Sequence, residues 1–359
     1  MMNADNNSPI RVLIADDSAF MRAALSRLVS SDSSLQVVGT AHNGADAVAK
    51  ALSLNPDVIT LDLDMPGVNG LEALQSIMAQ CPRPVIMISS LTQQGADSTL
   101  NALASGAFDY IPKQLATNSL DIDHLRDQLI VKIKAAAELY RRCSSSAVPR
   151  KPVRPVSESV SSAVAPAAIA IGTSTGGPKA LQDILPQLPS DLSVPVLVVQ
   201  HMPPGFTEPF ARRLNGLCSI RVCEAAHDDD LQAGVVYLAP SGFHMTVQRT
   251  DDTHARILLS DDPRGQLHHP SVDVLMLSLA EQFGPRAMGI VMTGMGSDGV
   301  IGMTAIHRRG GVTLGQDEAS SAVYGMPRAC ALAGCLTQVI SVAQIPQQIL
   351  LATRYRKRA

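Results

Sequence analysis

Short apolar runs and polar turns alternate along most of the chain. In the first third of the sequence the mainly apolar runs are Ile10–Ala15, Leu35–Val38, Val58–Leu61, Val85–Ile88 and Phe108–Ile111. Segments with a helical spacing of apolar residues lie between several of these runs. Strands that alternate with helices favour a parallel sheet covered by helices. We therefore predict a doubly wound α/β domain over residues 9–135.

The same alternation returns after a stretch of different composition. We predict a flexible linker over about residues 136–166. Lys132–Arg142 is predicted to end a helix, and Cys143–Pro166 mixes Ser, Ala, Val and Pro without an apolar period. A strand is then predicted to start at Ile169. Further strands are predicted at Val194–Gln200, Val235–Leu238, Ala287–Met292 and Val312–Leu314, with a hairpin of Met245–Gln248 and Ala255–Leu259. This pattern predicts a second, mainly parallel α/β domain over residues 167–359.

Composition narrows the classes of function. The 359 residues are 46% hydrophobic and 17% charged with a net charge of −3, which is typical of a globular protein and not of a polyanion binder. Aromatic residues make up 3% and Trp is absent, so we expect no nucleic-acid partner. No apolar run reaches the roughly 18 residues of a membrane span, and the polar N-terminus lacks a signal-peptide core, so we expect no membrane insertion. Six cysteines without a Cys-x-x-Cys spacing favour reduced thiols and a cytoplasmic location.

Polar side chains follow the predicted strands of the first domain. They are Asp16, Asp17, Asp62, Ser89 and Lys113. Ligands of doubly wound sheets bind at the carboxyl ends of the strands, and converging carboxylates with a lysine suit Mg²⁺. Asp62 could then attack a phosphoryl group. Taken singly, the acidic pair favours helix N-capping and Asp62 a loop carboxylate, but their joint position favours a site.

These residues closely resemble the receiver domain of bacterial response regulators, from Ile10 to about Gln114. The resemblance also rests on the loop Asp62-x-x-Met65-Pro66-x-x-x-Gly70 and on Tyr110. It implies a flavodoxin-like fold and phosphorylation of Asp62 by a histidine kinase. The Mg²⁺ ligands that it implies are Asp16, Asp17, Asp62 and the Asp64 backbone carbonyl. The residues that it implies for the phosphorylation switch are Ser89, Tyr110 and Lys113. Gln114 stands where receivers usually have proline.

In the second domain three strand ends present Ser174, His201 and Asp298. A serine hydroxyl needs a base to become a nucleophile, and a carboxylate can orient that base. Each residue also has a structural alternative, because Ser174 could be a turn residue, His201 a hydrogen-bonded strand end, and Asp298 the cap of a helix that follows Gly299. The adjacent pair His268–His269 could line a substrate groove.

Two familiar motifs fit this region poorly. Gly172-x-Ser174-x-Gly176 matches the nucleophile elbow of α/β-hydrolases, but that fold orders its triad Ser, acid, His, whereas the order here is Ser, His, Asp. A phosphate-binding P-loop is excluded because Pro178 interrupts the required Gly-Lys-Ser/Thr sequence.

The loops around these residues resemble the CheB methylesterase family over about residues 167–342. The resemblance rests on Gly172-x-Ser174-Thr175-Gly176-Gly177-Pro178, Gln200-His201-Met202 and Thr293-Gly294-Met295-Gly296-x-Asp298-Gly299. It implies hydrolysis of glutamate methyl esters on methyl-accepting chemoreceptors, often with deamidation of receptor glutamines, and the histidine kinase CheA as phosphodonor. We expect a Rossmann-like domain in which the esterase reaction uses no cofactor.

On this resemblance Ser174 is the nucleophile, His201 the base and Asp298 the orienting acid. Met295 and Thr175 are the candidate backbone donors of an oxyanion hole. We further hypothesise that the unphosphorylated receiver blocks access to Ser174. Two alternatives are a second domain that only binds a partner or DNA, and an esterase for small metabolites.

Overall fold

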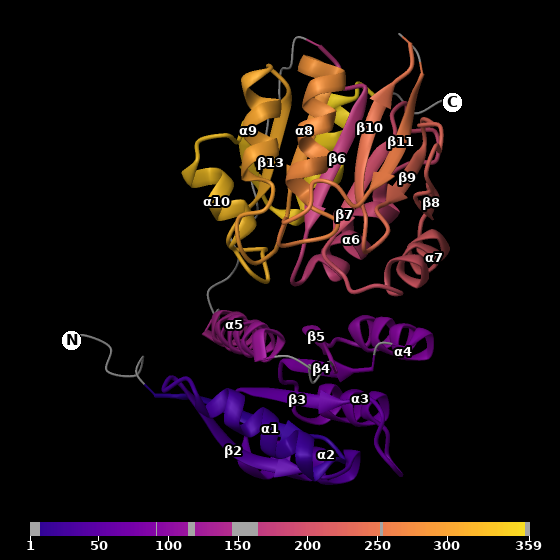
Figure 1. Cartoon of the computed structure of the whole chain (residues 1–359). Helices are drawn as coiled ribbons and strands as arrows, with labels where there is room; N and C mark the ends of the chain where they lie inside the picture. The colour runs from indigo at the N-terminus through magenta and orange to yellow at the C-terminus, as the bar shows by residue number, and fades with distance from the viewer. Residues whose placement is uncertain (1–7, 91, 114–118, 146–163, 252–253, 356–359) are drawn as a thin grey trace, which may run out of the picture. The chain divides into compact units, whose positions relative to one another are not determined.

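The computed structural model describes residues 8–90, 92–113, 119–145, 164–251 and 254–355 (Figure 1). The chain divides into two compact units, residues 1–152 and 153–359, and each is described by itself.

The first unit is built on a parallel sheet of five strands in the order β2-β1-β3-β4-β5. The strands are β1 (Ile10–Ala15), β2 (Leu35–Ala41), β3 (Val58–Asp62), β4 (Val85–Ser89) and β5 (Asp109–Pro112). The helices are α1 (Ala19–Ser30), α2 (Gly44–Leu54), α3 (Gly70–Gln80), α4 (Gln93–Ala104) and α5 (Ser119–Ser145). This strand order is the flavodoxin-like one, as predicted.

Local sequence explains where several of these helices begin. Ser18, Asn43, Asn69 and Thr92 are the N-caps of α1 to α4, and each side chain accepts a hydrogen bond from the backbone of the first turn. Sequence reasoning did not identify α4, whose amphipathic pattern is interrupted by several polar residues.

The connection between the units begins later than expected. Helix α5 continues to Ser145, so the residues from 136 to 145 are helical and not part of a linker. The remainder of the predicted linker, up to residue 163, lies outside the described residues, as does Gln114.

The second unit is built on a parallel sheet of seven strands in the order β14-β13-β12-β6-β7-β9-β8. Its strands are β6 (Ala168–Thr173), β7 (Val196–Gln200), β8 (Arg221–Glu224), β9 (Val235–Leu238), β12 (Ala287–Val291), β13 (Val312–Gln316) and β14 (Gln338–Ile340). Strands β8 and β14 were not predicted, because both are short and partly exposed. The order on either side of β6 confirms the Rossmann-like expectation.

Helices and a hairpin complete this unit. The helices are α6 (Gly177–Ile184), α7 (Thr207–Leu217), α8 (Val272–Phe283), α9 (Val300–Arg308), α10 (Met326–Leu332) and α11 (Ile345–Ala352), with 3-10 turns at Leu185–Gln187, Gly284–Arg286 and Val342–Gln344. The predicted antiparallel hairpin is present as β10 (His244–Arg249) and β11 (Ala255–Ser260). It is joined to α8, because the backbone N–H of Val247 donates to the Ser278 hydroxyl over 3.1 Å. Among the residues that the structure describes, none of the helices combines the length and the apolar character needed to cross a bilayer.

Strand β6 is the centre of the second sheet, and all six of its residues are buried. It needs a small residue where α8 begins, since a Cβ added at Gly172 would lie 2.3 Å from Cγ1 of Val272. Val272 is itself fully buried and β-branched, so it has little freedom to move away. Gly172 therefore allows the start of α8 to contact the end of β6.

This contact predicts the effect of Gly172→Ala. We expect the methyl group to push against Val272 and to lower the free energy of unfolding by about 1–3 kcal/mol. Calorimetry of the full chain, following the transition of the second unit, measures the effect. Gly216→Ala in α7 is the matched control, because nothing lies within 4 Å of its Cβ, and we expect it to be neutral or stabilising by about 0.5–1 kcal/mol. Equal effects of the two substitutions would contradict the interpretation.

Candidate active site and receiver site

The three predicted catalytic residues follow three neighbouring strands. Ser174 follows β6, His201 follows β7, and Asp298 lies on the loop after β12, while β6 pairs with both β7 and β12. The loops are tied to each other, since the His201 N–H donates to the Thr173 carbonyl over 3.1 Å and the Ser174 N–H to the Thr293 carbonyl over 3.0 Å. The site thus lies where the strand order reverses, which is the ligand-binding position of such sheets.

His201 and Asp298 form a direct pair. Nε2 of His201 lies 2.8 Å from Oδ2 of Asp298, and the two side chains are only 8% and 11% exposed. An ionised carboxylate can only accept, so Nε2 carries the proton. Nδ1 of His201 is buried and has no hydrogen-bond partner. This nitrogen is therefore an acceptor in the neutral ring and is available to a serine hydroxyl.

Asp298 also forms hydrogen bonds with the first turn of helix α8. Its carboxylate accepts from the backbone N–H groups of Val272 (2.8 Å) and Asp273 (2.9 Å) and from the hydroxyl of Ser271 (2.9 Å). The alternative in which Asp298 caps the helix after Gly299 is therefore wrong, because no such side-chain bond caps α9. The carboxylate instead lies at the N-terminus of a different helix, where the helix dipole favours negative charge.

These contacts determine the charge of Asp298. Burial by itself would raise the pKa of this carboxyl group. Hydrogen bonding and charge from His201, with the N–H groups of Asp273 and Val272, outweigh burial and lower the pKa to about 2. Asp298 is consequently ionised at neutral pH and can hold an imidazolium ion on His201.

Ser174 lies in a tightly constrained turn. Its carbonyl accepts from the Gly177 N–H over 2.8 Å and from the side-chain amide of Gln200 over 2.9 Å. Gly176 has a φ of +75°, and a Cβ at Gly294 would come within 2.9 Å of the Ser174 Cβ. Among the described residues no hydrogen bond joins the Ser174 hydroxyl to His201. The pairing of β6 with β7 brings the two residues to the same edge of the sheet.

The candidate oxyanion donors lie on the same two loops. Thr175 is buried and Met295 is half-buried. Within the part of the chain that the structure describes, the backbone N–H of neither residue donates to a protein acceptor. Both are thus available to a ligand, and their role in catalysis stays a prediction.

Sequence reasoning missed two contributors and one contact of a third residue. The buried amide of Gln200 donates to the carbonyls of both Ser174 and His201, which links the two catalytic loops. Ser271 was not singled out, although it bonds Asp298 and caps α8. The ring of His268 stacks on that of His201, a contact that was not foreseen, while its expected place at a substrate groove stays a prediction. The clue for Ser271 is a serine directly before a helix, whereas Gln200 carries no comparable signal.

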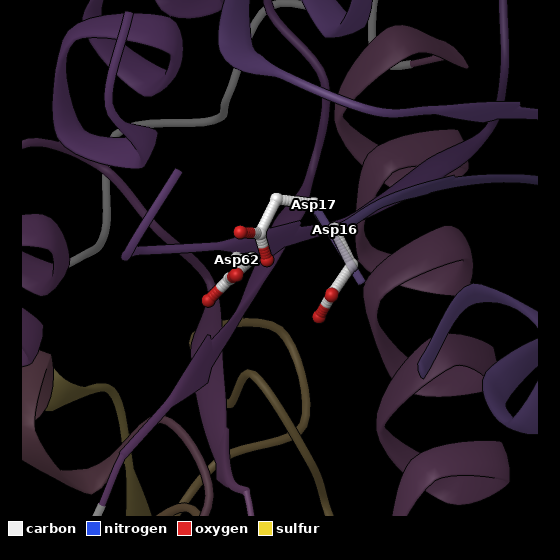
Figure 2. A group of neighbouring side chains, drawn as sticks. All are labelled: Asp16, Asp17 and Asp62. Atoms are coloured by element: carbon white, nitrogen blue, oxygen red, sulfur yellow. The ribbon is translucent and has the colours of Figure 1, made fainter. Parts of the chain in front are cut away.

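In the first unit, the predicted acidic residues gather at the carboxyl ends of β1 and β3 (Figure 2). Asp16 and Asp62 are fully buried and Asp17 is exposed. Nζ of Lys113 lies 2.7 Å from Asp62 and 3.2 Å from Asp16. The alternative in which the acidic pair caps α1 is wrong, because Ser18 is the N-cap and its N–H donates to Asp16.

These carboxylates fit a hard divalent cation. Asp16, Asp17 and Asp62 each offer an oxygen, and the three oxygens lie within 4.8 Å of one another. Mg²⁺ is usually bound by one or two carboxylates together with water molecules, so these oxygens are suitable donors. The Asp64 backbone N–H donates to Asp62 over 3.2 Å, so that loop adjoins the cluster. Its carbonyl as a ligand stays a prediction.

Burial dominates the charge state of Asp62. It raises the pKa of this carboxyl group to about 6, and the negative charge of Asp16 contributes, although Lys113 acts in the opposite direction. Burial also disfavours the ammonium ion of Lys113, but contact with Asp62 and Asp16 holds the pKa of the lysine above its usual value. The lysine therefore stays charged beside the acidic cluster.

Two of the three predicted switch residues, Ser89 and Tyr110, lie on β4 and β5. Ser89 is fully buried and accepts a hydrogen bond from the hydroxyl of Thr99 on α4 over 2.6 Å. Tyr110 is 5% exposed, and its carbonyl accepts from Nζ of Lys132. Their role as reporters of phosphorylation stays a prediction.

The raised pKa of Asp62 predicts a pH-dependent affinity for Mg²⁺. Since the proton competes with the cation below the pKa, we expect the Kd for Mg²⁺ to fall about tenfold from about pH 5 to about pH 7. Isothermal titration calorimetry of the full chain measures this dependence. In Asp62→Asn we expect weaker binding without the pH dependence, and an equal slope in the variant would contradict the assignment.

Comparison with known proteins finds a matching family for each of the two units. A sequence model of the family described as "CheB methylesterase" matches residues 169–349, and one described as "Response regulator receiver domain" matches residues 12–123. The protein-glutamate methylesterase/protein-glutamine glutaminase of Pyrococcus horikoshii is 43% identical, over 96% of this chain and 93% of that protein. The protein of the same name from Desulfitobacterium hafniense is 40% identical, over 97% of this chain and 99% of that protein.

A solved structure agrees with the second of these units. The crystal structure of the Thermotoga maritima CheB methylesterase catalytic domain is similar with a TM-score of 0.50 and 33% identity, over 52% of this chain and 98% of that chain. The two family matches fall one in each of the two units described above, and the relatives cover nearly the whole chain. The chain therefore belongs to the CheB methylesterase family and carries a response regulator receiver domain ahead of its methylesterase domain.

Proposed function

We propose that this chain is a phosphorylation-regulated protein-glutamate methylesterase and protein-glutamine glutaminase of bacterial chemotaxis. The observation that carries the proposal is the buried His201–Asp298 pair at the reversal point of the sheet, beside the constrained turn of Ser174. The family membership supplies the substrate class, which the geometry alone does not specify. The CheB methylesterase match disfavours the alternative of a second domain that only binds a partner or DNA.

The reaction uses the chain's own groups in two steps. Nδ1 of His201 accepts the proton of the Ser174 hydroxyl while the oxygen attacks the ester carbonyl, and Asp298 stabilises the imidazolium. His201 then returns the proton to the departing methoxy group, so that methanol leaves an acyl-enzyme. Water, activated by the same histidine, releases the glutamate. A glutamine side chain follows the same course and yields ammonia.

The N–H groups of Met295 and Thr175 are proposed to stabilise the oxyanion that forms on the carbonyl oxygen. Two backbone donors aimed at the developing charge provide the largest electrostatic contribution in many acyl-transfer enzymes. The absence of any bond from these N–H groups to the protein, within the described residues, supports this assignment.

Regulation is proposed to act through Asp62. A histidine kinase, CheA, would supply the phosphoryl group, and Asp16, Asp17, Asp62 and the Asp64 carbonyl would hold the Mg²⁺ that neutralises its oxygens. Lys113, at 2.7 Å from Asp62, supports the assignment because it can pair with an added phosphoryl oxygen. The substrates are methyl-accepting chemoreceptors, and we locate the reaction in the cytoplasm, where their methylated helices lie.

Removal of the nucleophile tests the catalytic assignment. We expect Ser174→Ala to lower kcat for methanol release from methylated receptor by at least about 10³-fold, because no other group can form the acyl-enzyme. Ser190→Ala, at an exposed position outside the site, is the matched control and should retain full activity. Retained activity in Ser174→Ala would refute the assignment. Hydrolysis of small esters without activity on receptors would favour a metabolite esterase.

Two variants of the receiver test regulation. We expect the wild type to be activated by a small phosphodonor such as acetyl phosphate, and Asp62→Asn to show no activation, because it lacks the phosphorylated carboxylate. Deletion of residues 1–140 should raise basal activity by relieving inhibition. Methanol release with and without the phosphodonor measures both effects. Unchanged basal activity after the deletion would refute inhibition by the receiver.

A further inference from the structure

The imidazole of His268 lies face to face with that of His201. The ring centroids are 3.9 Å apart and the planes differ by 18°. His268 is half-buried and belongs to the segment that leads into α8. His201 thus has one neighbour in the plane of its ring, Asp298 at Nε2, and another on its face.

The segment that carries His268 is connected to the catalytic pair a second time. Three residues further on, Ser271 and then the N–H groups of Val272 and Asp273 bond the Asp298 carboxylate. The same segment has a further contact, since the Ser271 N–H donates to Nδ1 of buried His244 over 3.2 Å. A single stretch of chain therefore holds the acid by hydrogen bonds and the base by ring contact.

The two contacts restrict different motions of His201. A hydrogen bond at Nε2 fixes the position of one ring atom but leaves the ring free to tilt about the line to Asp298. That tilt moves Nδ1, the atom that must meet the serine hydroxyl. A flat group against the ring face opposes the tilt, and catalytic groups need their geometry held within about 10–20°. The ring face is also where an aromatic group stabilises a cation such as the imidazolium.

We propose that His268 is a positioning residue for the esterase reaction, which sets the ring plane of His201 through stacking. The inference rests on the proposed function, because it assigns the partner of that same base. The property that acts is the flat aromatic face of His268 and not its ring nitrogens. The earlier expectation, that this histidine lines a substrate groove, becomes a competing outcome of the test.

Two substitutions separate these possibilities. His268→Ala removes the face, and we expect kcat for methanol release to fall about 10- to 100-fold with KM changed less than about threefold. His268→Phe keeps a flat ring without nitrogens, and we expect it to recover kcat to within about threefold of the wild type. His254→Ala, at an exposed histidine beside Asp251, is the matched control and should leave both constants unchanged.

A second readout does not depend on the receptor. A fluorophosphonate probe labels an activated serine, and its rate of reaction with Ser174 in the full chain should fall in His268→Ala and recover in His268→Phe by the same factors. If methanol release fails in the wild type while labelling still distinguishes the variants, the substrate proposal is wrong and the positioning role stands. If labelling is equal in all variants, the positioning role is wrong.

The remaining outcomes also decide the question. A raised KM with unchanged kcat in His268→Ala would show contact with substrate and would overturn the proposal. A defect in His268→Phe as large as that in His268→Ala would show that a ring nitrogen is required, which would overturn it too. Thermal unfolding of each variant identifies a loss caused by misfolding, and His268→Phe keeps the test decisive if His268→Ala is unstable.

Discussion

The carboxylate of Asp298 is the group on which the proposed catalytic arrangement depends. It accepts one hydrogen bond from His201 and three from the beginning of α8. It therefore connects the loops after β7 and β12 to a helix that does not directly follow either strand. Gly172 makes this possible, because only a residue without a side chain lets Val272 approach the end of β6. The same network that lowers the pKa of the acid thus positions the base, the helix and the segment that carries His268.

Two buried aspartates of this chain have pKa values that their surroundings shift in opposite directions. Asp298 receives N–H donors and an imidazole, which outweigh burial and keep it ionised, whereas Asp62 has burial and neighbouring Asp16 acting against its charge. A residue that orients a base must stay charged through turnover. The proposed phosphorylation of Asp62 suits a cluster of carboxylates whose negative charge a bound divalent cation would help to neutralise.

Both units place their chemistry at the carboxyl ends of parallel strands. In the first unit β1 and β3 carry the acidic residues and β5 leads to Lys113, and in the second unit β6 and β7 lead directly to Ser174 and His201. Parallel strands present successive loops on one edge, so residues far apart in sequence meet without long excursions of the chain. The receiver domain and the methylesterase domain that follows it therefore both use the loops at the carboxyl edge of a parallel sheet.

The sequence alone determined the alternation of strands and helices and the strand ends that carry Ser174, His201 and Asp62, since buried parallel strands are continuous apolar runs bounded by polar turns. It did not determine what Asp298 binds, because its partners lie 25 to 97 residues away in the chain. The roles of Gln200, Ser271 and the ring of His268 were likewise decided by tertiary structure. Each acts through a contact with another loop, and local periodicity carries no information about which loops become neighbours once the strands take their order in the sheet.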